Sequence, residues 1–200
     1  MLHERRLPAR SESYEPAEAP TQAVDLPNNL VKLRGINMSH PISAVGAIHT
    51  IVSLIPLAAG LIALKRYGSI DPRTRPGKLY WAGMLLSVIT AFALSSTGGF
   101  NPGHALGLLA LIVMLAATLA PRIALLGRAA RYIQVSLMSF SFLLLMIPGT
   151  NETLSRLPVG NPIGNGPESA PVRLALAVMF VLFLLGTAYQ WVQLRRYPER

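Results

Sequence analysis

Five stretches of the chain are almost entirely apolar, and each is long enough to cross a lipid bilayer. A helix rises about 1.5 Å per residue, so about 20 apolar residues span the roughly 30 Å hydrocarbon core of a membrane. Polar and charged residues gather between these stretches. The pattern therefore predicts an all-α integral membrane protein, a helical bundle of five transmembrane helices at residues 42–64, 79–96, 102–120, 129–147 and 171–190.

Proline and asparagine mark several of the predicted helix ends. Asn101 is suited to an N-cap, and Pro102 is suited to the first helical position of the third span. Pro148 is expected to stop the fourth span, because proline has no backbone N–H and its ring clashes with the preceding turn. Residues 148–170 are then predicted to form an outer loop. Pro56 is expected to kink the first span.

Lys and Arg are distributed unequally between the two sides that these spans create. One side carries Lys65, Arg66, Arg73, Arg75, Lys78, Arg122, Arg128, Arg131, Arg195, Arg196 and Arg200. The other side carries fewer basic residues near a span, and basic loops usually stay in the cytoplasm. We therefore expect the N-terminus outside, the C-terminus in the cytoplasm, and a bacterial inner membrane as the location. The reverse orientation stays open, because the residues before the first span would have to be translocated.

The composition agrees with a membrane protein. Hydrophobic residues make up 52% of the chain, charged residues make up 14%, and the mean hydropathy is +0.43, which does not describe a soluble surface. The net charge is +9, and the Lys and Arg residues that cause it lie beside predicted helix ends. They do not form a patch with aromatic side chains that could contact bases, so the expected partner is the lipid bilayer and not nucleic acid. The chain has no cysteine, which excludes disulfides and thiolate metal sites.

The residues ahead of the first span differ from the rest of the chain. Residues 1–37 are rich in Pro, Glu and polar residues, a composition that is typical of disorder. Within them, Leu30, Val31, Leu33 and Ile36 form a short amphipathic stretch that is suited to a membrane surface. The predicted organisation is thus a disordered or interfacial tail at 1–37 and a transmembrane domain at 38–197.

Three histidines are predicted near the outer face: His40 before the first span, His49 inside it, and His104 in the first turn of the third span. An ionisable residue within a span is costly, which makes His49 the first functional candidate. Gly103 and Gly107 flank His104 with the spacing that allows close approach of a helix or a flat cofactor. His49 and His104 are therefore candidate cofactor ligands, compatible with haem b. The alternative is that they only anchor helices by hydrogen bonds. On the predicted boundaries His49 lies about 10 Å deep and His104 about 3 Å deep, which is an awkward arrangement for two axial ligands of one iron.

Glu152 and Arg156 are spaced i, i+4 with the acid first, the favourable order for an ion pair on a helical turn. One interpretation is a solvated pair that contributes a few tenths of a kcal/mol. The other places these side chains, with His40, over the mouth of an outer pocket that His49 and His104 line. A metal is neither predicted nor excluded by this set.

Four segments carry a family resemblance: HPISAVGAIH at 40–49, GKLY at 77–80, GGFNPGH at 98–104 and IPGTNETLSRLP at 147–158. On these the chain resembles an uncharacterised bacterial family of multi-spanning membrane proteins, known only as a domain of unknown function, over about residues 38–195. Arg73-Thr74 stands where such proteins often carry His-Arg, and Leu145 where some carry histidine. The resemblance implies the membrane fold and no established activity.

Three functions follow as hypotheses. The first is a small non-catalytic inner-membrane protein that serves as an accessory or scaffolding subunit of a larger membrane complex, with other membrane-protein subunits as partners. It is motivated by small residues on the predicted helices and by the lack of nucleotide-binding, metalloprotease or serine-hydrolase motifs. The second is a haem- or quinone-linked redox protein that uses His49 and His104. The third is a transporter or sensor with an outward-facing pocket.

Overall fold

The computed structural model describes residues 44–94 and 99–196, and these residues are helical with short connections and no strand. Five long helices follow one another: α2 (Ala44–Tyr67), α3 (Arg75–Phe92), α4 (Pro102–Leu119), α5 (Ala129–Arg156) and α6 (Ala170–Arg196). Two 3₁₀ turns, η1 (Ala120–Arg122) and η2 (Ala124–Leu126), connect α4 to α5. The prediction of an all-α chain is confirmed for the described residues. His40 and the tail at 1–37 lie outside them.

Four of the helical segments are long and apolar enough to cross a membrane, as in a multi-pass membrane protein. They are Ala44–Tyr67, Pro102–Arg122, Ala129–Arg156 and Ala170–Arg196. The helix α3 is shorter, with 18 residues, and its first turn contains Arg75 and Lys78, which leaves a shorter apolar run than in the other helices. The predicted second span is thus present as a helix, and the fifth crossing stays a prediction.

The start of α4 confirms the predicted helix signals. Asn101 is the N-cap and its side chain accepts a hydrogen bond from the backbone N–H of His104, while Pro102 occupies the first turn. The His104 side chain in turn accepts from the backbone N–H of Asn101, which completes a capping box. Two backbone N–H groups that a bare helix end would leave without partners are thereby satisfied.

The prediction that Pro148 ends the fourth span is wrong. The helix α5 continues through Pro148 to Arg156 and ends at Leu157, whose backbone is extended. Leu157 precedes Pro158, and the residue before a proline disfavours helical geometry. A proline inside a membrane helix removes one backbone bond, which neighbouring groups can compensate. Residues 148–156, predicted as part of the outer loop, are therefore the last turns of a helix.

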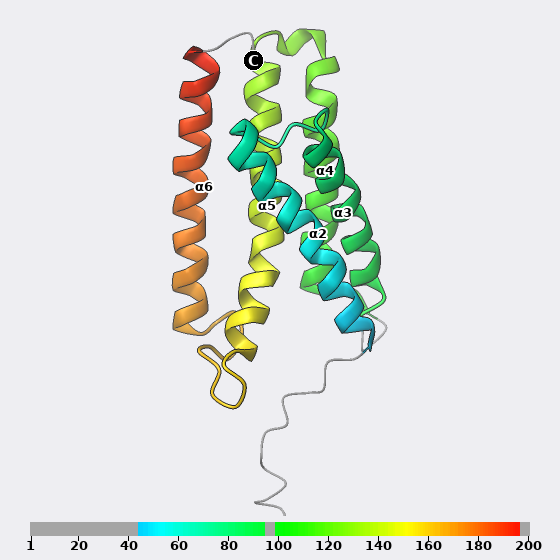
Figure 1. Ribbon diagram of the computed structural model, residues 1–200, viewed down its shortest axis with the longest axis vertical. Coiled ribbons are helices and arrows are strands. Elements are labelled where there is room, and N and C mark those ends of the chain that lie inside the picture. The colour runs from blue at the N-terminus through cyan, green and yellow to red at the C-terminus, as the bar shows by residue number, and fades with distance from the viewer. Residues whose placement is uncertain (1–43, 95–98, 197–200) are drawn as a thin grey trace, which may run out of the picture. The chain divides into compact units, whose positions relative to one another are not determined.

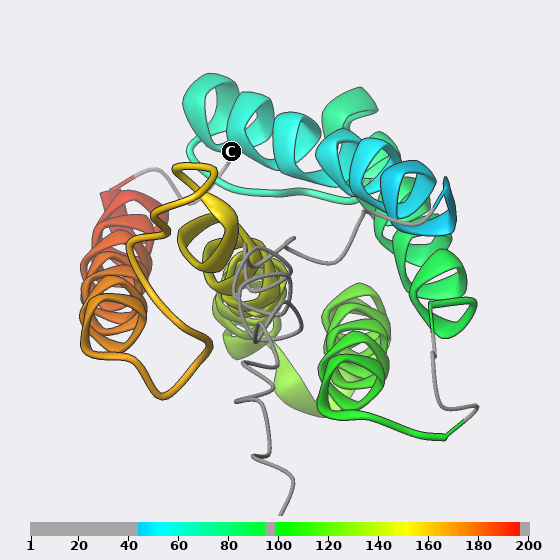
Figure 2. The same cartoon turned by 90° about the horizontal axis from the view of Figure 1, so that it is seen from below.

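The helices pack in an ordered series in which successive neighbours run antiparallel (Figure 1). The closest pairs are α2 with α3, α4 with α5, and α5 with α6. Viewed along the helices, α5 lies between α4 and α6 (Figure 2). The helix α6 is therefore at the edge of the bundle. Among the described helices, α5 packs along it.

The core lies where α2, α3, α4 and α5 meet. Its buried apolar side chains are Ala59, Ala63, Ile70, Tyr80, Met84, Ala110, Val113, Met114, Ala117, Met138 and Leu144. Tyr80 is fully buried, and its hydroxyl lies 2.9 Å from that of Ser141 on α5. The Ser141 hydroxyl donates to the carbonyl oxygen of Met138 at 2.7 Å, so the Tyr80 hydroxyl donates to Ser141. This bond joins α3 to α5 inside the core.

Close contact between α2 and α3 depends on small residues. Gly83 of α3 faces Pro56 of α2, and a Cβ added at Gly83 would lie 2.8 Å from the Pro56 Cδ and 3.0 Å from its backbone nitrogen. Such a distance leaves no room for a side chain, and backbone atoms cannot move aside at low cost. Pro56 is buried and α2 is continuous through it. The two helices can therefore approach here because residue 83 is glycine.

Because successive helices run antiparallel, every second connection lies at the same end of the bundle. The connections at one end carry many Lys and Arg residues, and we call it the basic end. It comprises Lys65, Arg66, Arg73, Arg75, Lys78, Arg122, Arg128, Arg131, Arg195 and Arg196. The opposite end comprises the starts of α2, α4 and α6 and the ends of α3 and α5 (Figure 1). It carries the predicted site residues among the described residues.

Candidate functional site

His49 is the centre of a polar cluster between α2 and α3 near the opposite end. Its Nδ1 lies 2.9 Å from the Thr90 hydroxyl oxygen. The Thr90 hydroxyl donates back to its own helix, at 2.9 Å to the Ser87 carbonyl and 3.1 Å to the Leu86 carbonyl. Since a hydroxyl has one proton, the His49 Nδ1–H is the donor to Thr90. In the neutral form of the imidazole, His49 Nε2 is then the acceptor nitrogen.

Two serines complete this cluster. The Ser53 hydroxyl lies 2.6 Å from the Ser87 hydroxyl, and it also donates to the His49 carbonyl at 2.8 Å. The same Ser53 oxygen is 3.4 Å from His49 Nε2, a long contact. His49 and Ser53 are four residues apart on α2, and Ser87 and Thr90 three apart on α3, so each pair shares one helix face. We call these four residues the His49 cluster.

The His49 cluster satisfies most of its own hydrogen-bonding groups. Ser87 is buried, while His49, Ser53 and Thr90 are partly buried. Its arrangement joins two helices through side chains in an otherwise apolar span, which is a common role for polar residues in membranes. One atom is left with only a long contact, His49 Nε2, and it is an acceptor. This atom is where a donor from a ligand could bind.

His104 is held differently, with both ring nitrogens bonded to backbone. Its Nδ1 accepts from the Asn101 N–H at 3.3 Å, and its Nε2 lies 3.0 Å from the Ala91 carbonyl oxygen, to which it donates. The ring stacks on Phe92 at a centroid distance of 4.6 Å and meets Phe100 at 5.8 Å. His104 is only 4% exposed. As arranged, it connects the end of α3 to the start of α4 and offers no free nitrogen to a metal.

The two histidines thus reach neighbouring residues of α3, Thr90 and Ala91, from two different helices. In the described part of the chain no hydrogen bond joins the two imidazoles to each other, and no group of three His, Asp or Glu side chains is placed to hold a metal ion. Axial ligation of a haem by His104 would require one of its two backbone hydrogen bonds to break. Both predicted histidines are therefore hydrogen-bonded to the last turn of α3, at Thr90 and Ala91.

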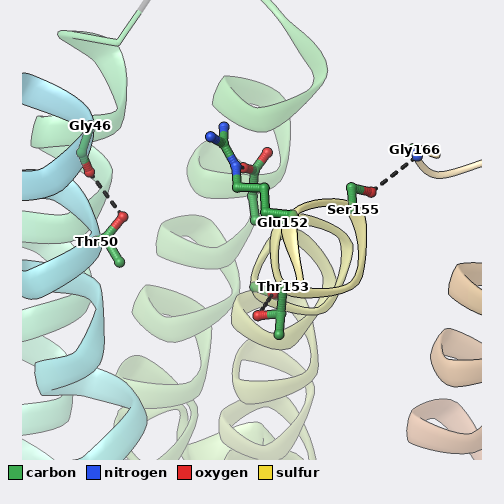
Figure 3. A network of polar contacts seen from close by, with 8 residues as sticks. Gly46, Thr50, Glu152, Thr153, Ser155 and Gly166 are labelled. Carbon is green, nitrogen blue, oxygen red and sulfur yellow. Dashed lines mark hydrogen bonds and ion pairs between the residues drawn. The ribbon is translucent and has the colours of Figure 1, made fainter. Parts of the chain in front are cut away.

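Glu152 and Arg156 lie on the last turns of α5, where the Arg156 Nε donates to a Glu152 carboxylate oxygen. The predicted ion pair is formed, and its side chains are 57% and 47% exposed respectively. Figure 3 shows Glu152, Thr153 and Ser155 on different sides of this end of α5, with Ser155 accepting from the Gly166 N–H of the following loop at 3.0 Å. Among the described residues, no hydrogen bond joins this ion pair to His49 or His104. The outer pocket that would unite these residues stays a prediction.

The sequence analysis missed Gln190, which is buried near the end of α6. Its side chain accepts from the Ser139 hydroxyl at 2.9 Å and donates to the Gly68 carbonyl oxygen at 3.0 Å. Next to it, the Trp191 Nε1 donates to the Ser136 hydroxyl at 2.9 Å. A lone amide at the end of an apolar run could have indicated such a junction, because polar groups in membrane helices seek partners on neighbouring helices.

The sequence analysis also missed a groove at the basic end. An open cavity of about 520 Å³ is lined by Ala59, Ile62, Arg66, Tyr67, Arg75, Pro76 and Leu79 of α2 and α3. A second, of about 380 Å³, lies between α5 and Trp191 of α6 and is lined by Ala129, Tyr132, Ile133, Ser136 and Leu137. Both lie away from the predicted outer site. Only the antiparallel pairing of the helices brings their lining residues together.

Comparisons of the chain with protein-family models, with curated proteins and with solved structures found no match.

Proposed function

We propose that the protein is a small non-catalytic subunit, accessory or scaffolding, of a larger complex in the bacterial inner membrane, with its C-terminus in the cytoplasm. The observation that carries this proposal is the incomplete packing of α6. Only Val172 and Gln190 of its residues are buried. Its exposed large side chains are Leu174, Val178, Phe180, Val181, Leu182, Leu184, Leu185, Tyr189, Trp191 and Val192.

The surface of α6 also contains a position where a neighbouring helix would pack better than a lipid chain. Gly186 is exposed, and a Cβ added there would have no heavy atom within 4 Å apart from its chain neighbours and the backbone of its own helix. A glycine adds little apolar area toward lipid, whereas small residues let two helix backbones approach closely. We therefore propose that a transmembrane helix of a partner subunit packs along α6 over Gly186.

The contacts that hold α6 to the bundle support this role. Gln190 and Trp191 attach it at the basic end, and the Thr150 hydroxyl donates to the Met179 sulfur at 3.1 Å nearer the opposite end. An edge helix that is attached at two levels presents its outer surface in a defined position, as a rigid interface requires.

The test is extraction in mild detergent at native expression levels. The wild-type chain is expected to migrate with other membrane proteins, and Gly186→Leu is expected to release it, because the added side chain keeps a partner backbone away. The matched control is Ala116→Leu, which places the same side chain on an exposed position of α4. A wild-type chain that migrates as a monodisperse monomer, or a Gly186→Leu variant that stays in the complex, contradicts the proposal.

The second candidate is the sensor or transporter with an outward-facing site, favoured by one observation. His49 lies within an apolar helix, and its Nε2 is 3.4 Å from the Ser53 hydroxyl, a long contact that leaves room for a stronger donor. This function predicts that His49→Gln changes ligand binding while expression stays the same, and unchanged binding removes its support. The haem alternative is less well supported, because His104 would have to give up a backbone hydrogen bond. A Soret band in protein expressed with haem would support the haem alternative.

A further inference from the structure

The groove between α2 and α3 at the basic end combines two kinds of lining. Arg66 lies in the last turn of α2 and Arg75 begins α3, and both side chains are exposed at the mouth of the groove. Ile62 and Leu79, each 52% exposed, lie about one turn further along the same helices, on the side of the apolar spans. The groove is therefore cationic where the helices end and apolar where they enter the predicted membrane.

The two guanidinium groups have no acidic partner in the described part of the chain. Arg66 places its Cζ atom 5.6 Å from the centroid of the Tyr67 ring, an arrangement that leaves its N–H groups available at the edge. The nearest acid in sequence, Asp71, uses its carboxylate to accept from the Arg73 backbone N–H at 2.8 Å. The described ion pair of this structure, Glu152 with Arg156, lies at the other end.

Two unneutralised guanidinium groups on either side of a groove are suited to one anionic oxyacid group. Arginine presents N–H donors in a planar fork that matches phosphate geometry. The apolar lining below them suits a hydrocarbon chain, and the ends of membrane-spanning helices lie at the depth of lipid headgroups. A cavity of about 520 Å³ is within the roughly 300–1,000 Å³ of small-ligand sites, enough for a headgroup and the start of an acyl chain.

We propose that this groove binds an anionic phospholipid, with the phosphate between Arg66 and Arg75 and an acyl chain along Ile62 and Leu79. Charge complementarity selects an acidic headgroup over a zwitterionic one, and the apolar lining selects a lipid over a free anion. The proposal does not depend on a partner subunit, because the groove is formed by α2 and α3 and not by α6. It also holds for either orientation of the bundle.

The test uses the purified full chain in a neutral detergent, titrated with phosphatidylglycerol or phosphatidylcholine and followed by native mass spectrometry. The wild type is expected to retain phosphatidylglycerol in preference to phosphatidylcholine. The double substitution Arg66→Gln with Arg75→Gln is expected to weaken phosphatidylglycerol binding about tenfold or more. The matched control, Arg195→Gln with Arg196→Gln, removes the same charge from the basic end outside the groove and is expected to change binding by less than about twofold.

Two further arms identify the ligand and protect the test against misfolding. Inorganic phosphate, the free-anion probe, is expected to bind at least about tenfold more weakly than the lipid, because it gains nothing from the apolar lining. Arg66→Lys keeps the charge and loses the fork, so it should fold if the double substitution does not, and it is expected to weaken lipid binding measurably. Equal losses in the double substitution and its control, no preference for phosphatidylglycerol, or phosphate binding as tight as lipid binding would each overturn the proposal.

Discussion

The side chain of Gln190 on α6 donates a 3.0 Å hydrogen bond to the carbonyl oxygen of Gly68, in the connection between α2 and α3. The same amide accepts from Ser139 on α5. One buried side chain thus connects three parts of the bundle that are far apart in sequence. It also attaches the edge helix to the bundle at the basic end.

Replacing Gln190 by leucine is expected to lower the free energy of unfolding by about 1–2 kcal/mol, because its hydrogen bonds to α5 and to the connection between α2 and α3 are lost while a similar volume is kept. Thermal unfolding in detergent measures the change. Gln193→Leu is the control, since Gln193 donates to the Tyr189 hydroxyl of its own helix, and its loss should cost much less. Equal effects of the two substitutions would show that Gln190 does not anchor α6.

Gly83→Ala is expected to destabilise the protein by roughly 1–3 kcal/mol, since its methyl group would lie 2.8 Å from the Pro56 Cδ and overpack the contact between α2 and α3. Gly149→Ala provides the contrast. Gly149 lies inside α5, and apart from its chain neighbours and its own helix backbone no heavy atom is within 4 Å of the added Cβ. Alanine should therefore raise stability by about 0.5–1 kcal/mol through helix propensity. Melting temperatures that move in the same direction in both variants would contradict this account of the contact.

The bond between His49 and Thr90 is expected to couple the two side chains by about 0.6 kcal/mol, the typical value for an interhelical hydrogen bond in a membrane. A double-mutant cycle with His49→Leu and Thr90→Val, read by unfolding in detergent, isolates this coupling. The pair His104 and Thr90 serves as the control cycle, because His104 bonds to the Ala91 backbone and not to Thr90. A larger coupling in the control pair would contradict a direct hydrogen bond between His49 and Thr90.

Glu152→Gln is expected to change stability by no more than a few tenths of a kcal/mol. Its partner Arg156 is a neighbour on the same helix, and both side chains are about half exposed, so water and salt screen the pair. Unfolding measured at low and high salt should show the small difference disappearing at high salt. A loss above about 1 kcal/mol that persists in high salt would indicate that the carboxylate has a second partner.

Local signals along the chain were enough to predict the helices and several of their ends. Asn101 and Pro102 predict the start of α4 because capping depends on residues within one turn of each other. The order of Glu152 before Arg156 predicts their ion pair for the same reason. The apolar runs could be predicted as membrane helices because the length of each run can be compared with the thickness of a bilayer without knowledge of the fold.

The apolar helices, the start of α4 and the basic end of the bundle could be predicted from the sequence alone, since these depend on neighbours in the chain. The remaining features depend on how the helices pack. The tertiary structure extended α5 beyond Pro148, bonded both nitrogens of His104 to backbone, placed α6 at the edge with Gln190 as its anchor, and brought Arg66 and Arg75 to one groove. Each of these features depends on contacts between helices. A single stretch of sequence does not specify which helices pack together or how each is rotated about its own axis.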